Sequence, residues 1–152
     1  MNAQCKIESR PAQPTVSVRT RTPVSELPVV IGPLYGRIIA YVGEMGAAPT
    51  GAPFVAYYNM DMADLDIEVG FPVDRALPSR GDLSGSVLAS GDYATCMHIG
   101  PYDQVGPAYT ALTEFVQQLG RTPTGVAYEF YYNSPQETPP EQLQTLVMFP
   151  LV

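Results

Sequence analysis

An internal repeat constrains the fold of this 152-residue chain more than any single motif does. Residues 32–59 align with residues 106–133 at a constant offset of 74 and without a gap. Eleven of the 28 aligned pairs are identical: Gly32/Gly106, Pro33/Pro107, Tyr35/Tyr109, Val42/Val116, Gly46/Gly120, Pro49/Pro123, Thr50/Thr124, Gly51/Gly125, Tyr57/Tyr131, Tyr58/Tyr132 and Asn59/Asn133. After a four-residue insertion the match resumes at an offset of 78, with Leu65/Leu143, Val69/Val147, Phe71/Phe149 and Pro72/Pro150. Two copies predict a duplicated unit rather than a solenoid, which requires three or more repeats.

Hydrophobic periodicity predicts the same strand–helix–strand–strand order in both copies, here placed at about 13–73 and 87–152. The elements expected in the first copy are a strand over 15–21, a helix over 25–46 and strands over 54–58 and 64–73. Those expected in the second copy are a strand over 87–98, a helix over 103–120 and strands over 125–132 and 143–151. A further short strand is expected over 5–9. The fold class is therefore α+β, with one pseudo-symmetric antiparallel sheet and both long helices on one face.

Proline, glycine and polar residues predict where these elements begin, break and end. The first helix should be interrupted near Pro28 or at Gly32-Pro33, because proline suits a first helical turn and breaks an interior. Gly46 is placed as a left-handed residue after that helix, and Asp103 as the N-cap of the second. The polar, turn-rich segment 74–86 lies where a linker between the halves is expected.

Composition narrows the classes of partner. The net charge of −7 argues against binding to nucleic-acid phosphates and is compatible with cationic ligands. No apolar run approaches the roughly 20 residues of a membrane helix, so no membrane partner is expected. The N-terminal residues 1–6 lack the apolar core of a secretory signal, which favours a cytoplasmic location. Cys5 and Cys96 with His98 form no metal-ligand set, so no metal or cofactor is expected, and we favour free thiols over a disulfide.

The stretch 126–133 contains an acid in an otherwise aromatic and β-branched strand, and this acid is Glu129. Its repeat counterpart is Val55, so the acid belongs to one copy only. A carboxylate in an apolar strand either faces water or is buried to meet a partner from outside the chain. Both faces of the strand are apolar enough to be buried, so the pattern alone does not say which face Glu129 occupies.

Two segments carry a resemblance to a known family. They are His98-Ile-Gly-Pro-Tyr-Asp-Gln-Val-Gly-Pro-Ala-Tyr109 and Gly125-Val-Ala-Tyr-Glu-Phe-Tyr-Tyr-Asn-Ser-Pro-Gln-Glu-Thr-Pro-Pro-Glu141. They resemble the strand-to-helix connection, the glutamate strand and the proline-rich loop of the GyrI-like (AraC-type) effector-binding, multidrug-binding domains. The resemblance covers the whole chain and implies a single stand-alone domain over 1–152. It also implies an SHS2-type duplicated fold with a central ligand cleft.

In that family the glutamate of this strand meets bulky, often cationic aromatic ligands, and the resemblance assigns this role to Glu129. The other candidate ligand-binding residues are its counterpart Val55 and three equivalent aromatic pairs, Tyr57/Tyr131, Tyr35/Tyr109 and Phe71/Phe149. For each aromatic residue, plain core packing is the alternative.

The resemblance leaves two classes of function open. The first is a non-catalytic protein that sequesters or senses lipophilic cations, like the sensor domains of multidrug-responsive transcription regulators. The second is a hydrolase of electrophilic, cyclopropane-bearing genotoxins, with Glu129 as general base and Tyr131 or Tyr109 as proton donor. We rank the enzyme second, because the sequence supplies the acid and the tyrosines but no geometry. Contact with DNA gyrase is implied by family analogy only.

Overall fold

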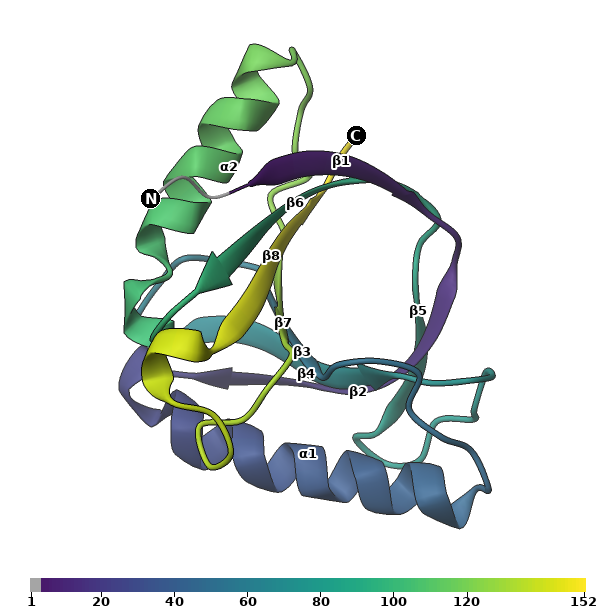
Figure 1. Ribbon diagram of the computed structural model, residues 1–152. Helices are drawn as coiled ribbons and strands as arrows, with labels where there is room; N and C mark the ends of the chain where they lie inside the picture. The colour runs from purple at the N-terminus through teal and green to yellow at the C-terminus, as the bar shows by residue number, and fades with distance from the viewer. Residues whose placement is uncertain (1–3) are drawn as a thin grey trace. The chain divides into compact units, whose positions relative to one another are not determined.

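A computed structural model describes residues 4–152 of the chain (Figure 1). Residues 1–3, which belong to the predicted domain and to the segment tested for a signal sequence, lie outside this range. The chain divides into two compact units, which we call the first unit (residues 11–90) and the second unit (residues 4–10 with 91–152). Each unit contains one α-helix of more than three turns and a set of antiparallel strands, which confirms the predicted α+β class.

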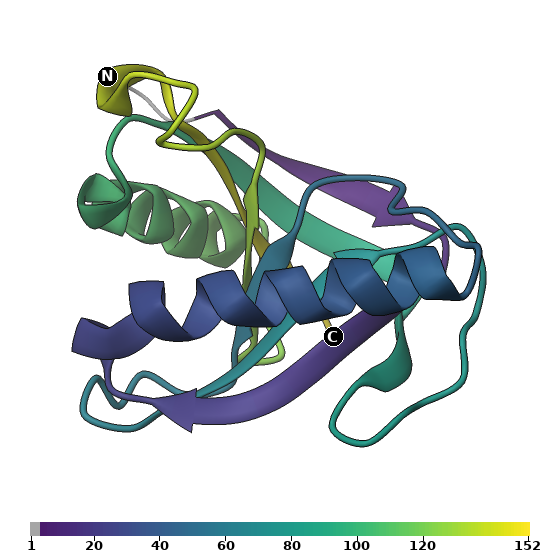
Figure 2. The same cartoon turned by 90° about the horizontal axis from the view of Figure 1, so that it is seen from below.

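The first unit packs helix α1 on an antiparallel sheet. Its elements are β2 (Gln13–Thr22), the 3-10 turn η1 (Val24–Glu26), α1 (Leu27–Glu44), β3 (Phe54–Tyr57), β4 (Leu65–Pro72) and β5 (Ser84–Leu88). The strand order is β3–β4–β2–β5. Val69 lies opposite Val18 on one side and Val55 on the other, and all three are buried. Helix α1 lies along β2 and β4, as Figure 2 shows, and buries Ile38 and Val42.

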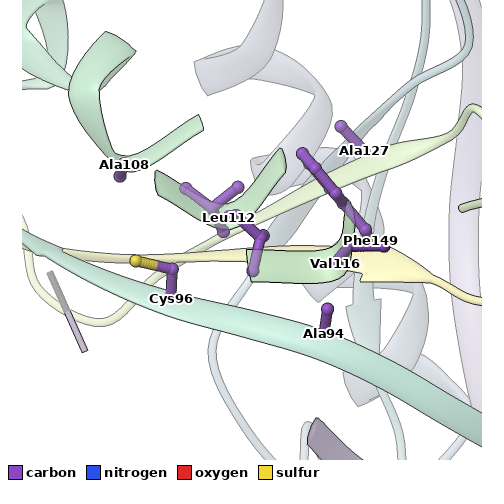
Figure 3. Close-up of a cluster of buried hydrophobic side chains, with 8 residues drawn as sticks. Ala94, Cys96, Ala108, Leu112, Val116, Ala127 and Phe149 are labelled. Carbon is purple, nitrogen blue, oxygen red and sulfur yellow. The ribbon is translucent and has the colours of Figure 1, made fainter. Parts of the chain in front are cut away.

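The second unit repeats this plan around helix α2. Its elements are β1 (Cys5–Arg10), β6 (Gly91–Ile99), the 3-10 turn η2 (Tyr102–Gln104), α2 (Gly106–Gln118), β7 (Ala127–Tyr131), the 3-10 turn η3 (Pro140–Gln142) and β8 (Gln144–Pro150). The strand order is β1–β6–β8–β7. Figure 3 shows the core, where Leu112 and Val116 of α2 pack against Ala94 and Cys96 of β6 and Phe149 of β8.

Equivalent positions of the repeat make equivalent contacts within the two units. Gly46 and Gly120 follow the two helices with φ of 69° and 68°, the left-handed conformation predicted for Gly46. The side chain of Asn59 accepts the N–H of Asp66 at 3.0 Å, and that of Asn133 accepts the N–H of Gln144 at 2.9 Å. Identical residues in the two copies therefore hold the same turns.

Three local predictions are wrong. Segment 74–86 is not a linker between units, because it lies within the first unit and ends in β5. The strand expected over 87–98 is broken, since β5 ends at Leu88 and β6 begins at Gly91, whose φ of 149° favours glycine. Asp103 is not the N-cap of α2: it lies in η2, and the helix begins at Gly106 without a side-chain cap.

The two prolines of α1 behave differently from one another. Pro28 lies in the first turn, where η1 gives way to α1, so the helix changes geometry there as predicted. Pro33 lies inside an unbroken helix on its exposed side, so the interruption expected there as an alternative does not occur. No helix within residues 4–152 is both long and apolar enough to span a membrane.

Candidate functional site

Glu129 faces helix α2. It lies on β7 between Ala127 and Tyr131 in the alternation of that strand, and Ala127 belongs to the core cluster beneath α2. The strand register places Glu129 opposite Val147 of β8, which belongs to the same cluster. The glutamate itself is half-buried. The question that the sequence left open is therefore answered: the acid points to the helix-covered face.

Two tyrosine hydroxyls converge on the Glu129 carboxylate. Tyr109, near the start of α2, donates to Oε2 at 2.5 Å, and Tyr131, two residues along β7, donates to Oε1 at 2.8 Å. Each carboxylate oxygen therefore has a donor, and hydrogen bonds to an ionised acceptor are about twice as strong as neutral ones. The ion pairs formed by residues 4–152 do not include Glu129.

Aromatic rings extend this cluster on both sides. The Phe149 ring lies against Tyr109, with ring centroids 5.8 Å apart. On the other side, the Tyr102 ring meets Tyr131 edge-on at 5.4 Å. The result is a continuous row of Phe149, Tyr109, Glu129, Tyr131 and Tyr102, which we call the Glu129 cluster. Neutral rings with one carboxylate among them suit a ligand that is both aromatic and cationic.

In the first unit, the residues predicted for the site form a different arrangement. Tyr35 meets Phe71 at 5.2 Å, much as Tyr109 meets Phe149, but its hydroxyl donates to the backbone carbonyl of Phe54 at 3.1 Å. Val55 is fully buried, and Tyr57 is half-buried on β3. The structure thus brings Glu129, Tyr109, Tyr131 and Phe149 together in the second unit, and Tyr35 and Phe71 together in the first.

A sequence comparison decides the family. The sequence matches the family described as GyrI-like small molecule binding domain over residues 3–152. This chain belongs to the GyrI-like family. A comparison with curated proteins by sequence found no match.

Solved structures share the GyrI-like fold. The C-terminal domain of EcmrR superposes with a TM-score of 0.80 at 21% identity, covering 100% of this chain and 99% of that domain. EcmrR in its complex with DNA gives 0.84 at 22% identity and covers 98% of this chain but 57% of that one, so our chain spans little more than half of it. A hydrolase from Listeria innocua gives 0.71 at 15% identity, covering 98% and 92%. SAV2435 bound to tetraphenylphosphonium gives 0.62 at 13% identity, covering 100% and 94%.

Tyr102 is the member of the Glu129 cluster that sequence reasoning missed. Its hydroxyl donates to the backbone carbonyl of Asn133 at 3.1 Å, and burial raises the pKa of this phenol. The sequence signal was present in the Gly-Pro-Tyr turn just before α2, but this turn lies outside the aligned repeat segments.

Three other titratable side chains of the second unit lie outside the Glu129 cluster. The Nε2 of His98 lies 2.9 Å from the carbonyl of Pro101, so this histidine has a structural partner in the turn before η2. Cys5 and Cys96 are free thiols, as predicted, and burial raises the pKa of Cys96 to about 12. Residues 4–152 contain no group of three His, Cys, Asp or Glu side chains placed to hold a metal ion.

Proposed function

We propose that this GyrI-like protein binds bulky, lipophilic, aromatic cations, with Glu129 as the group that pairs with the charge. The observation that carries the proposal is the convergence of the Tyr109 and Tyr131 hydroxyls on a half-buried carboxylate that forms no ion pair in residues 4–152. The family description as a small-molecule-binding domain supports a ligand of this size class. The tetraphenylphosphonium on SAV2435 supports the chemistry, at the level of a shared fold.

The energies of charge pairing and of cation–π contacts favour a cation over a neutral ligand. A carboxylate and a cation about 4 Å apart gain roughly 4 kcal/mol at an effective dielectric near 20, before desolvation is subtracted. Each aromatic face next to a delocalised cation adds about 0.5–2 kcal/mol. Neither contribution requires one ligand shape, so the proposal includes a site that accepts several cations. Binding of this kind would serve either to sequester lipophilic cations or to sense them.

We also propose that the chain is one domain built by duplication, with repeats over 13–73 and 87–152. The repeated glycine and asparagine contacts of the two units support this interpretation. The common helical face stays a prediction of the repeated element pattern, and the SHS2-type fold with a central cleft stays a prediction of the family resemblance.

The test is a calorimetric titration of the protein with tetraphenylphosphonium. Wild-type protein should bind in the micromolar range or tighter, and Glu129→Gln should weaken binding at least about 10-fold, because the amide keeps the shape of the side chain but not its charge. Equal binding by wild type and Glu129→Gln would show that charge pairing at this residue is not the mechanism.

Glu68→Gln is the matched control for this experiment. Glu68 is also half-buried and also accepts two hydroxyls, from Ser17 at 2.5 Å and Tyr58 at 2.5 Å. The guanidinium of Arg19 lies 3.7 Å from the Tyr58 ring centroid, so this carboxylate already has a cation nearby. Removal of its charge should leave the affinity for tetraphenylphosphonium within about twofold.

The same geometry favours a hydrolase as the second candidate. Glu129 has two phenols on its carboxylate, as the combination of a general base and a proton donor requires, and the Listeria innocua hydrolase shares the fold. In this mechanism Glu129 would take a proton from water as the water oxygen bonds to one carbon of the cyclopropane. The C–C bond at that carbon would break, and Tyr109 or Tyr131 would protonate the other carbon of the broken bond. The proton on Glu129 would then pass to the tyrosinate and restore both groups. Incubation with a cyclopropane-bearing alkylator should then yield a ring-opened product, and Glu129→Gln should abolish it. Absence of product with wild-type protein leaves the binding function alone.

A further inference from the structure

The two units differ in how the chain reaches its helix. Helix α1 begins at Leu27, whereas α2 begins at Gly106, the repeat counterpart of Gly32. The second unit therefore lacks the first turn of the helix and has η2 in its place. Extension of the 74-residue offset places Tyr102 at the position of Pro28. At this position, as at Glu129 and Val55, the units differ in chemistry.

The turn that carries Tyr102 is fixed from several sides. Gly100 has a φ of 138°, which favours glycine, and its N–H donates to the carbonyl of Leu143 at 2.8 Å. His98 Nε2 lies 2.9 Å from the carbonyl of Pro101. The Tyr102 hydroxyl then donates to the carbonyl of Asn133, just beyond the end of β7. The position of the ring is set by these contacts rather than by burial in the core.

The Tyr102 ring is one side chain away from the carboxylate. It is 37% exposed, and its edge-on contact is with Tyr131, whose hydroxyl is on Glu129. An aryl group attached to a cation at Glu129 extends several ångströms from the charge. A ring within about 6 Å of a cation, or in contact with its aryl groups, contributes to binding.

We propose that Tyr102 is a specificity-determining residue of the Glu129 cluster: its ring contacts the aryl groups of the cation and selects multi-aryl cations over small ones. This inference rests on the proposed function. It assigns to Tyr102 the recognition of ligand size and aromaticity, and leaves recognition of charge to Glu129. The ring carries the role, and the hydroxyl holds the ring in place.

The experiment compares two cations on four proteins and one control variant by calorimetry. The cations are tetraphenylphosphonium and tetraethylammonium, and the proteins are wild type, Tyr102→Leu, Tyr102→Phe and Glu129→Gln. Tyr102→Leu should weaken tetraphenylphosphonium about 5- to 30-fold and change tetraethylammonium less than about twofold. Tyr102→Phe, which keeps the ring, should lose less than about threefold in affinity for either cation.

Tyr132→Leu is the matched control. Tyr132 follows β7 and is 47% exposed, but the alternation of the strand directs its side chain away from the face of Glu129.

The outcomes separate this inference from the proposed function. If wild type binds neither cation, both the proposed function and the role of Tyr102 are overturned. If Glu129→Gln weakens binding but Tyr102→Leu binds tetraphenylphosphonium like wild type, the role of Tyr102 alone is overturned. The role of Tyr102 would also be overturned if Tyr102→Leu weakened both cations equally. The same holds if Tyr102→Phe lost as much affinity for tetraphenylphosphonium as Tyr102→Leu does.

A measurement on wild-type protein keeps the test independent of whether the variants fold. Nuclear Overhauser contacts between the phenyl protons of tetraphenylphosphonium and the Tyr102 ring protons should appear in the complex. Their absence, with contacts to Tyr131 present, would contradict the proposal. His98 is the one histidine of the sequence, and its single pair of ring signals reports whether the turn before η2 is intact in each variant.

Discussion

The two units place the same tyrosine on the same helix and give its hydroxyl different partners. Tyr35 and Tyr109 are repeat equivalents, and each lies against the equivalent phenylalanine, at 5.2 Å from Phe71 and 5.8 Å from Phe149. The hydroxyl of Tyr35 donates to a backbone carbonyl on β3, whereas that of Tyr109 donates to the Glu129 carboxylate on β7. The two units therefore share the contact between tyrosine and phenylalanine, but only the second unit has a carboxylate beside it.

This difference shows what the fold supplies and what one residue adds. The repeated framework brings a helix tyrosine and a strand phenylalanine into contact in both units. In the first unit a fully buried valine, Val55, occupies the position that Glu129 takes in the second. The first unit therefore completes a core at this position, and the second places a half-buried carboxylate there.

The largest expected effect comes from moving the acid into the other unit. Val55→Glu should lower the free energy of unfolding by about 3–5 kcal/mol, because the Val55 site is fully buried and an ionised carboxylate there loses its hydration. Urea denaturation measures this change. The reciprocal Glu129→Val is the control and should cost less, about 1–3 kcal/mol, because the position is half-buried and the loss comes from the Tyr109 and Tyr131 hydroxyls, which have no acceptor in the variant. Equal costs for the two exchanges would mean that the units do not differ in the way described.

Removal of the paired tyrosine hydroxyls should give a smaller, unequal effect. Tyr109→Phe removes a donor to a carboxylate and should cost about 1–2 kcal/mol of stability, whereas Tyr35→Phe removes a donor to a carbonyl and should cost about 0.5–1 kcal/mol. Thermal unfolding of both variants against wild type makes the comparison. A greater loss in Tyr35→Phe would contradict the assignment of the stronger hydrogen bond to the second unit.

The smallest expected effect on stability comes from Asp82, an acid that forms an ion pair with Arg37. Hydrogen bonds from Arg37 lower the pKa of Asp82 in the first unit, so this exposed carboxylate stabilises the fold above its ordinary pKa, near 4, and loses that contribution as pH falls through the lowered value. Asp82→Asn should therefore unfold close to the wild-type temperature at pH 7, because exposed pairs contribute little. Its stability should also decline less steeply below about pH 4. A large loss at pH 7 would contradict this ranking.

The sequence predicted the acid and its neighbours but not how they meet. The repeat predicted Tyr109 and Phe149 as equivalents of Tyr35 and Phe71, and the contrast with Val55 singled out Glu129. The direction of Glu129 could not be predicted, because both faces of the strand are apolar and the pairing of β7 with β8 sets the register. The hydroxyl contacts depend on the rotation of α2, which hydrophobic spacing defines only to within a side chain.

One prediction was wrong, and one residue was missed, for local reasons. The break between β5 and β6 falls on Ala89-Ser90, two residues inside an otherwise strand-like run, and Gly91 alone marks it. Tyr102 was missed because its counterpart, Pro28, is not aromatic, so the comparison of the copies gave it no equivalent. Comparison of the copies identifies differences only within the aligned segments, and these segments begin at Gly32 and Gly106, after Pro28 and Tyr102.

The central claim is that Glu129 recognises positive charge, and a matched pair of ligands tests it most directly. Methyltriphenylphosphonium and triphenylphosphine oxide have similar shapes and differ in charge. Wild-type protein should prefer the cation at least about 10-fold by calorimetry, and Glu129→Gln should reduce that preference to about threefold or less. An undiminished preference in Glu129→Gln would contradict the account, because the charge would then be recognised elsewhere.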